Sequence, residues 1–533
     1  MANTKYIFVT GGVVSSLGKG IVAASLGKLL QARGYKVTIQ KLDPYINVDP
    51  GTLNPYEHGE CYVTEDGRET DLDLGHYERF LNIPTSKFNN ITTGRIYKNV
   101  IERERKGDFL GKTVQIIPHI TDEIKRNILY LGKTGKYDFV ITEIGGTVGD
   151  IESLPFIESV RQLRWELGKR CICLHLTYVP YIAAAKEVKT KPTQHSVKSL
   201  QEQGVQPNIL VLRTEKKLTK KICDKVALFC NVDPDAVIQS YDVSSIYEVP
   251  VVMAEQKLDT IVLQQMGMPT DQVSDLSRWK AFLDNMRTAK EIVKIGLVGK
   301  YVELPDAYKS ISESLLQAAT YHHRKLKLHY IHSEKLNEQN VESQLKDLDG
   351  ILVAPGFGHR GVEGKFVALK YAREHNKPTF GVCLGMQCMV IEFARNVLGF
   401  ADANSTEMDE NSAHKVIDLM EEQKNLTVMG GSMRLGAYDC HLEEGSKARA
   451  AYKSDCARER HRHRYEFNNE YKTIFEENGM RCTGINPDTG LVEVVEIPAL
   501  KWYLGTQFHP EYNSTVARPN PLFMSFIEAA IMK

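Results

Sequence analysis

Near its start the sequence reads Tyr6-Ile-Phe-Val-Thr-Gly-Gly-Val-Val-Ser-Ser-Leu-Gly-Lys-Gly20, followed by a stretch of helical character, Ile21–Arg33. The apolar run Tyr6–Thr10 predicts a buried strand, and the glycines predict a tight turn into the helix. A helix that begins after such a turn directs backbone N–H groups and the positive end of its dipole at one point, which suits a chain of phosphates. The sequence therefore predicts an α/β domain that binds a nucleotide, although such a turn can also serve only as a connection.

The spacing within this loop bears on how a metal would be held. Lys19 would supply a positive charge for the outer phosphates. Five residues separate Gly12 from Gly18, and Gly20 stands where a Ser or Thr normally coordinates magnesium. A metal therefore needs other oxygen ligands, for which Asp73, in an acidic stretch, and Glu143, at the end of an apolar run, are the candidates. The alternative for Asp73 is an ordinary surface carboxylate.

The composition describes a folded chain with more than one domain. Its 533 residues are 42% hydrophobic and 25% charged, values close to the average for globular proteins. The 67 Lys and Arg residues balance the 67 Asp and Glu residues, which argues against sequence-independent nucleic-acid binding. Because no apolar stretch approaches the roughly 20 residues of a membrane span and no secretory leader is visible, we expect a cytoplasmic protein without a membrane or nucleic-acid partner. The ten cysteines form no CxxC pair, so reduced thiols are expected.

Short β-branched runs that alternate with helical stretches fall into two sets and predict two doubly wound α/β domains. The predicted strands are Tyr6–Thr10, Val37–Lys41, Phe139–Glu143, Cys171–Thr177 and Ile209–Arg213 in the first set, and Val293–Val298, Ile351–Ala354, Thr379–Val382 and Trp502–Gln507 in the second. The polar stretch Gly267–Arg278 separates the sets. We therefore expect domains at 1–268 and 291–533 with a linker at 269–290.

A second site is predicted in the later half. Gly381-Val-Cys383-Leu-Gly385 follows a predicted strand and has the form of a nucleophile elbow, in which a helix N-terminus favours the thiolate. His509 and Glu511 follow another strand, so the histidine could take the thiol proton while the glutamate orients it. Leu384 and Gly356 are the expected oxyanion donors, because Pro355 has no N–H. Either Cys383 or His509 alone would more often be structural, but their joint occurrence favours a catalytic triad.

These motifs, in this order, resemble the CTP synthase family, in which a P-loop-like, dethiobiotin-synthetase-like synthase domain precedes a class I glutamine amidotransferase domain. The resemblance covers essentially the whole chain. It rests on Val9–Gly20 together with the strings Lys41–Gly51, Thr64–Phe80, Glu143–Ser153, Lys189–Gln194, Gly381–Gln387 and Arg460–Tyr465. It implies ATP-dependent amination of UTP to CTP through a 4-phosphorylated intermediate, with ammonia released from L-glutamine and passed internally between the domains. It also implies Mg²⁺, activation by GTP, feedback inhibition by CTP, and a homotetramer that in some members stacks into filaments.

The resemblance assigns residues to each ligand by matching motifs. It implies ATP contacts at Ser16, Leu17, Gly18, Lys19, Gly20, Ile21, Lys41, Asp73, Tyr241, Asp242 and Val243. UTP or CTP contacts are implied at Ser15, Asp150, Ile151, Glu152, Lys189, Thr190, Lys191, Pro192, Thr193, Gln194 and Lys225. Glutamine contacts are implied at Gly356, Leu384, Gly385, Met386, Gln387, Glu407 and Arg464, magnesium ligands at Asp73 and Glu143, and catalysis at Cys383, His509 and Glu511.

Several of these residues also allow a second interpretation. Without the family, Lys189 and Lys191 would be solvated surface charge, and Arg458–Arg464 a nucleic-acid patch or an exposed helix face. Cys61 stands where the family usually has Val, near a segment implied to line the ammonia path, and the turn Ala354-Pro355-Gly356 departs from the usual Pro-Gly-Gly. The rival functions are a cofactor-amidating synthetase of the cobyric acid type and a nucleotide-gated assembly or partition ATPase with an inert amidotransferase half.

Overall fold

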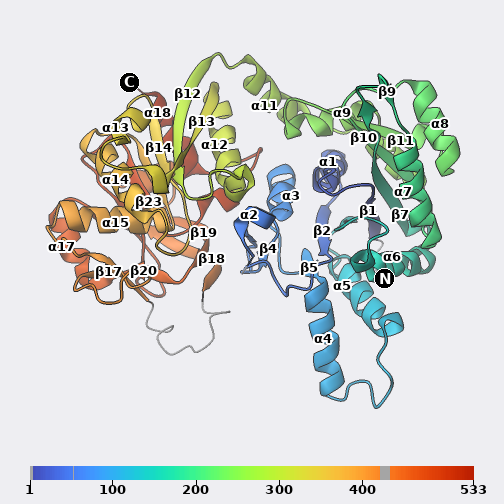
Figure 1. Cartoon of the computed structure of the whole chain (residues 1–533), viewed down its shortest axis with the longest axis horizontal. Coiled ribbons are helices and arrows are strands. Elements are labelled where there is room, and N and C mark those ends of the chain that lie inside the picture. The colour runs from blue at the N-terminus through green and yellow to red at the C-terminus, as the bar shows by residue number, and fades with distance from the viewer. Residues whose placement is uncertain (1–3, 52, 420–432, 533) are drawn as a thin grey trace. The chain divides into compact units, whose positions relative to one another are not determined.

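The computed structural model describes residues 4–51, 53–419 and 433–532, which form two compact units. The first unit comprises Met1–Pro50 and His76–Leu283, and the second comprises Gly51–Gly75 and Asp284–Lys533. Figure 1 shows the course of the chain, coloured by residue number. A short segment from the early part of the sequence, 51–75, therefore packs with the later unit. The sequence-based boundaries at 268 and 291 stay a prediction, and helix α11 (Ser277–Thr288) lies between them.

The first unit is built on a seven-stranded sheet in which every neighbouring pair is parallel. Its strands, in spatial order, are β11 (Val237–Tyr241), β10 (Ile209–Thr214), β7 (Cys171–Tyr178), β1 (Lys5–Gly11), β6 (Phe139–Ile144), β2 (Val37–Asp43) and β5 (Asn90–Thr92). β1 pairs with both β6 and β7, so the glycine-rich loop leaves the carboxyl edge of a central strand. That edge is where open α/β sheets bind ligands.

Helices cover both faces of this sheet because successive side chains on a strand point to opposite sides. Val140 packs into a buried cluster with α4 (Thr93–Arg105), α5 (Thr121–Lys133) and α6 (Leu154–Leu167). The adjacent Ile141 faces α1 (Lys19–Ala32), where a Cβ on Gly27 would lie 3.5 Å from its Cδ1. Figure 1 shows α1 near α9 (Val249–Glu255). The further helices of this part of the chain are α3 (Asp73–Leu81), α7 (Lys191–Glu202), α8 (Lys220–Cys230) and α10 (Leu258–Gln265).

The second unit holds a nine-stranded mixed sheet. In spatial order its strands are β13 (Arg324–His332), β12 (Glu291–Gly299), β14 (Gly350–Val353), β15 (Thr379–Val382), β23 (Tyr503–Thr506), β22 (Val492–Glu496), β21 (Arg481–Ile485), β18 (Arg434–Leu442) and β19 (Cys456–His463). The strands from β13 to β23 pair in parallel, and those from β23 to β19 pair antiparallel. Smaller sheets of this unit pair β16 (Asn404–Ser405), β17 (Lys415–Leu419) and β20 (Tyr465–Phe467), and β3 (Tyr62–Val63) with β4 (Glu69–Thr70). The pair of β8 (Tyr181–Ile182) with β9 (Glu187–Val188) belongs to the first unit.

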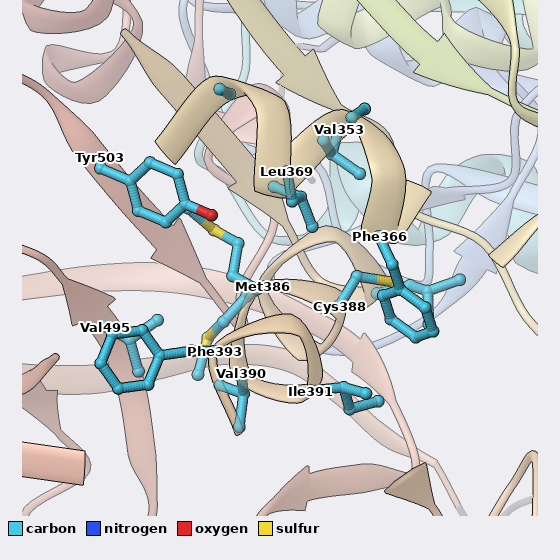
Figure 2. Close-up of a cluster of buried hydrophobic side chains, with 14 of the residues drawn as sticks. Val353, Phe366, Leu369, Met386, Cys388, Val390, Ile391, Phe393, Val495 and Tyr503 are labelled. Carbon is cyan, nitrogen blue, oxygen red and sulfur yellow. The ribbon is translucent and has the colours of Figure 1, made fainter. Parts of the chain in front are cut away.

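Two buried clusters fill the faces of the large sheet. One lies under α14 (Val362–Glu374) and α15 (Leu384–Asn396), and the other under α12 (Lys309–Tyr321) and α18 (Pro521–Ile531). Figure 2 shows Met386 and Phe393 of α15 beside Tyr503 and Val495 of the sheet. Each such buried side chain contributes about 1.5–3 kcal/mol, so α15 and the elbow before it rest on a rigid base. The short helices are α2 (Pro55–His58), α13 (Val341–Leu345), α16 (Lys447–Tyr452) and α17 (Lys472–Glu477).

The predicted two-domain α/β fold is confirmed, and all nine predicted strands coincide with observed ones to within two residues at each end. The alternative of an exposed helix face at Arg458–Arg464 is wrong, because these residues form β19 and the loop after it, and Arg460 is only 1% exposed. All ten cysteines are free thiols. Within the described ranges, none of the helices has the length and apolar character to cross a membrane.

Candidate active sites

The candidate nucleophile lies at a sharp turn between β15 and α15. Cys383 has φ 52°, a left-handed conformation that is costly for a residue with a Cβ and is typical of a nucleophile elbow. The two flanking glycines are required by close packing. A Cβ on Gly385 would lie 2.2 Å from the carbonyl oxygen of Val353, and one on Gly381 would lie 2.5 Å from Met389 Sδ. The local sequence therefore allows the turn that places the thiol at the start of α15.

The histidine and the glutamate form a buried pair beside this turn. His509 Nδ1 lies 2.7 Å from Glu511 Oε1, and both side chains are less than 6% exposed. The imidazole stacks on Tyr512 with ring centroids 5.0 Å apart. The backbone N–H of His509 donates to the carbonyl of Arg460 in β19. The ring is thus held in place by its carboxylate partner, by stacking and by its own backbone.

The Cys383 thiol has contacts on two sides. It donates to the carbonyl oxygen of Arg462 at 3.8 Å, and the Gln507 side-chain amide donates to its sulfur at 3.7 Å. Burial by itself disfavours the imidazolium, but the charges of Glu511 and Cys383 outweigh it and raise the pKa of His509 to about 10. A histidine of this basicity can hold the thiol proton and stabilise a thiolate. Gln507 was missed by sequence reasoning, although it precedes His509 by two residues in the same motif.

Three of the residues predicted to bind glutamine, Gln387, Glu407 and Arg464, lie near Tyr465. Gln387 Nε2 donates to the carbonyl of Tyr465 at 2.9 Å. The charges of Glu407 and Arg464 act in opposite directions on the Tyr465 hydroxyl, whose pKa burial raises. Glu407 also accepts from the backbone N–H of Gly358 at 2.7 Å, which ties it to the turn predicted to hold the oxyanion donors. The second unit thus gathers an acidic and a basic group, as recognition of an amino acid requires.

Two lysines support that turn and were not predicted. The fully buried Lys365 donates to the carbonyl of Ala354 at 2.7 Å, and burial lowers the pKa of its amine. Lys300 donates to the carbonyl of Phe357, and burial together with neighbouring cations lowers its pKa to about 8. A Cβ on Gly356 would lie 3.6 Å from Leu384 Cδ2, so the two predicted oxyanion donors belong to neighbouring residues in space.

The segment 51–75 is tied to β19 inside the second unit. The buried Arg460 guanidinium donates to the Tyr62 hydroxyl and to the Val63 carbonyl, each at 3.0 Å. Arg462 Nε lies 2.8 Å from Glu69 Oε1. Cys61 is half-buried and its Sγ lies 3.8 Å from the same carboxylate oxygen. The strand whose backbone contacts Cys383 and His509 therefore also holds this early segment.

The glycine-rich loop forms a turn that leads directly into α1. Gly18, with φ 90°, caps α1, and Ser15 and Ser16 of the loop are exposed. The Lys19 side chain lies along the loop, since a Cβ on Gly11 would be 2.7 Å from Lys19 Cδ, and its Nζ donates to the Gly146 carbonyl. The other residues of the predicted ATP loop, Leu17, Gly20 and Ile21, lie at the same turn and on the first turn of α1.

Charged groups line the carboxyl edge of β2 and β6. Lys41 and Glu143 are partners in the register of these strands, and both are less than 7% exposed. Lys41 Nζ lies 3.5 Å from Asp43, and Glu143 accepts from the Tyr77 hydroxyl. Asp73 is the first residue of α3. Within the described ranges, no group of three or more His, Cys, Asp or Glu side chains could by itself hold a metal ion.

Most of the residues predicted to contact UTP lie on two segments of the first unit, before α6 and at the start of α7. Asp150, Ile151 and Glu152 are exposed before α6, and Lys189 and Lys191 are exposed where α7 begins. A cavity of about 480 Å³ lies beside the glycine-rich loop and α7; it is lined by Val13, Thr147, Val148, Lys191, Pro192, His195, Ser196 and Ser199. The remaining predicted residues lie on neighbouring elements: Thr190, Thr193 and Gln194 at the start of α7, and Lys225 on α8.

The segment predicted to lie on the adenine side follows β11. Asp242 pairs with Arg213 at 2.5 Å, and the Lys217 amine lies 4.8 Å from the centre of the Tyr241 ring. Val243 is half-buried beside them. These contacts place an aromatic ring and charged groups at the carboxyl end of β11.

Comparison with known proteins identifies both halves of the chain. The model of the CTP synthase N-terminus matches residues 5–268, and that of class I glutamine amidotransferases matches residues 303–529. The CTP synthase of Porphyromonas gingivalis is 71% identical over 531 residues, covering 100% of this chain and 98% of the relative. That of Bacteroides fragilis is 69% identical over the full length of both chains, and that of Flavobacterium johnsoniae is 61% identical, covering 100% of this chain and 99% of the relative. A solved glutaminase domain of Trypanosoma brucei CTPS with bound acivicin is 40% identical, covers 45% of this chain and 93% of that chain, and has a TM-score of 0.43.

Proposed function

The chain belongs to the CTP synthase family and catalyses the glutamine-dependent amination of UTP to CTP in pyrimidine biosynthesis, and we propose that its residues divide this reaction between two sites. Cys383, His509 and Glu511 release ammonia from glutamine in the second unit. The glycine-rich loop and the residues around it activate UTP in the first unit. The two tasks require different chemistry, which is why one chain carries two sites.

The release of ammonia proceeds through a thioester. The Cys383 thiolate attacks the side-chain amide carbon of glutamine, so that a C–S bond forms and the C–N bond breaks. The proton held by His509 passes to the departing nitrogen, and water then hydrolyses the thioester to glutamate. The backbone N–H groups of Leu384 and Gly356 stabilise the oxyanion. Glu407 and Arg464 bind the amino and carboxylate groups of glutamine, and Gly385, Met386 and Gln387 complete its pocket.

The activation of UTP makes its 4-oxo group a leaving group. The γ-phosphoryl of ATP is transferred to this oxygen, which yields ADP and 4-phosphorylated UTP. Ammonia then attacks C4, and phosphate departs as CTP forms. Lys19 and Lys41 stabilise the charge on the transferred phosphoryl, and Ser16–Ile21 cradle the ATP phosphates. Tyr241–Val243 contact the adenine side, while Ser15, Asp150–Glu152, Lys189–Gln194 and Lys225 bind UTP or, in inhibition, CTP.

Magnesium fits the acidic groups of the nucleotide site. Glu143 is a nearly buried carboxylate at the carboxyl end of β6, and carboxylate oxygens are the ligands that this hard cation prefers. Together with Asp73 it would hold the ion against the ATP phosphates. When bound, the ion neutralises phosphate charge during transfer.

Regulation and assembly follow the family pattern in this proposal. GTP activates the enzyme, CTP inhibits it, and the chain works in the cytoplasm as a homotetramer that can extend into filaments. The first unit supports self-association, since a cavity of about 650 Å³ is bordered by Ile46, Ile116 and Ile151, which are 73%, 51% and 82% exposed. Exposed apolar patches of this kind mark protein interfaces. Native mass spectrometry with and without UTP and ATP tests the tetramer.

The arrangement that carries the proposal is the elbow at Cys383 beside the 2.7 Å pair of His509 and Glu511. The test supplies purified protein with UTP, ATP and magnesium, together with glutamine or ammonia, in parallel assays with and without GTP. CTP, ADP and phosphate are expected with either nitrogen source, glutamate is expected with glutamine, and GTP is expected to raise only the glutamine-dependent rate. ATP turnover without CTP would reject the proposal.

A further inference from the structure

A buried histidine bridges two segments that the proposed function assigns to different nucleotides. His175 lies on β7 and is fully buried. Its Nδ1 is 2.8 Å from the Thr10 hydroxyl on β1, and its Nε2 is 2.8 Å from the Ser196 hydroxyl on α7. Thr10 directly precedes the glycine-rich loop. Ser196 lies two residues beyond Gln194, on the helix that begins with the UTP-binding string.

The donor and the acceptor in each of the two hydrogen bonds of His175 can be assigned. A neutral imidazole has one donor and one acceptor nitrogen. Burial, together with the charge of Lys19, lowers the pKa of His175 to about 3, so the ring is neutral at physiological pH. The Thr10 hydroxyl can donate to the Leu174 carbonyl at 3.4 Å, which leaves its oxygen to accept from Nδ1–H. Nε2 then accepts from the Ser196 hydroxyl.

The loop backbone packs directly on this bridge. A Cβ on Gly12 would lie 1.8 Å from Ser196 Oγ and 3.5 Å from His175 Cε1, so the absence of a side chain at position 12 lets the helix approach the loop. The Gly12 N–H also donates to the Leu176 carbonyl of β7 at 3.0 Å. Ser196 in turn lines the cavity of about 480 Å³ beside the loop. The loop and α7 are therefore in direct contact at Gly12 and Ser196.

We infer that His175 is a positioning residue that couples binding of ATP at the glycine-rich loop to binding of UTP at the start of α7. The inference rests on the proposed assignment of these two segments. His175 touches neither nucleotide; it acts through Thr10 and Ser196. Because such coupling is reciprocal, each nucleotide increases the affinity for the other by the same factor.

Substitutions can remove one of the two hydrogen bonds of His175 and leave the other. The amide of H175N lies near the position of Nδ1 and keeps the Thr10 contact, whereas that of H175Q lies near Nε2 and keeps the Ser196 contact. S196A removes a single hydroxyl and leaves the ring in place. T38V is the matched control, because it removes a buried hydroxyl that accepts from Asn89 at 2.9 Å on β2 of the same sheet.

The test measures by calorimetry the affinity of the full chain for a non-hydrolysable ATP analogue, with and without saturating UTP. In the wild type and T38V, UTP should raise this affinity about fivefold or more, within the usual range of coupling between sites. In H175N, H175Q and S196A the ratio should fall to near one, while in the two histidine variants each affinity measured alone changes less than about threefold and circular dichroism is unchanged.

Two outcomes overturn the inference in different ways. If the histidine variants keep the wild-type ratio, or if the wild type shows a ratio of one, His175 only fills the core and the proposed sites still stand. If the wild type binds neither nucleotide, the proposed function itself fails, and the inference fails with it.

Discussion

Arg462 Nε lies 2.8 Å from Glu69 Oε1, although 393 residues separate them in the sequence. The pair is largely buried, with side-chain exposures of 14% and 10%. The same arginine accepts the Cys383 thiol hydrogen bond on its backbone carbonyl. The ion pair therefore connects the segment 51–75 to the strand that contacts the proposed nucleophile.

The variant E69Q should impair glutamine use selectively. Removing the carboxylate leaves the Arg462 guanidinium without its charge partner, and β19 shifts beneath Cys383. We expect kcat/KM for glutamine to fall roughly tenfold, since a 1 Å displacement near reacting groups can cost up to about a hundredfold. Synthesis from ammonia should stay near wild type, because it bypasses Cys383. Steady-state assays with both nitrogen sources measure this.

D439N is the control for E69Q. It breaks the ion pair between Asp439 and Arg458, which lies on β19 like Arg462, and the side chains of both partners are about half exposed. Exposed pairs contribute little, about 0–1 kcal/mol. Equal losses with glutamine and ammonia in E69Q would contradict the role given to the pair.

The variant E511Q should shift the pH at which Cys383 reacts. Burial opposes the His509 imidazolium, and the Glu511 charge is the largest of the effects that raise the pKa of the ring to about 10. Without that charge the pKa of His509 falls, fewer thiolate–imidazolium pairs exist at neutral pH, and iodoacetamide alkylation of Cys383 moves to higher pH. At pH 7 the rate should drop about tenfold or more, because the loss of a charge partner moves a pKa by about 1–3 units.

Mass spectrometry of the modified peptides provides the readout, with the half-buried Cys456 as an internal reference. An unchanged pH profile for Cys383 in E511Q would remove Glu511 from the proposed triad.

The variant G385A should destabilise the second unit. Its Cβ would lie 2.2 Å from the backbone oxygen of Val353, which cannot move without distorting β14. Overpacking of this kind costs about 1–3 kcal/mol or more. Thermal unfolding followed by calorimetry should show a lower melting temperature for G385A than for the wild type. A melting temperature of G385A equal to that of the wild type would contradict this packing account.

In the variant H175N the free energy of unfolding should decrease less in acid than it does in the wild type. The folded-state pKa of His175 is lowered to about 3 from an ordinary 6.5, so below pH 6.5 the unfolded chain binds a proton that the folded chain does not. Wild-type stability therefore falls as pH decreases from 6.5 towards 3. The difference in free energy of unfolding between the wild type and H175N should therefore be about 2 kcal/mol smaller at pH 5 than at pH 7.

Urea titrations at the two pH values test this, with T38V as the control whose difference from the wild type should stay constant. A difference for H175N that is larger at pH 5 would show that His175 is charged in the folded chain.

The sequence predicted most of the parallel strands of both sheets, because buried parallel strands are continuous apolar runs. It missed the parallel strands β5, β11 and β13, which lie at the edges of their sheets. The antiparallel strands of the second unit escaped prediction. β19 contains Arg460, His461 and Arg462, which carry no apolar alternation because their charges are buried against specific partners. Such pairing is set by the folded structure and leaves no periodic signal.

The motifs of both sites could also be read from the sequence, since a glycine turn and an elbow are local features. The attachment of segment 51–75 to β19 could not be read, because it depends on contacts between residues nearly 400 positions apart. The role of Lys365 could not be predicted, because no motif marks this lysine within the helix α14. His175 left one signal, a lone polar ring within the apolar run Cys171–Leu176.

The division of labour between the two sites is tested most directly by comparing C383A and K19A in the CTP assay with glutamine and with ammonia. C383A should lose glutamine-dependent synthesis and retain synthesis from ammonia, because only nitrogen release needs the thiol. K19A should lose both, because UTP is no longer activated. Loss of both activities in folded C383A, or normal CTP formation by K19A, would contradict the account.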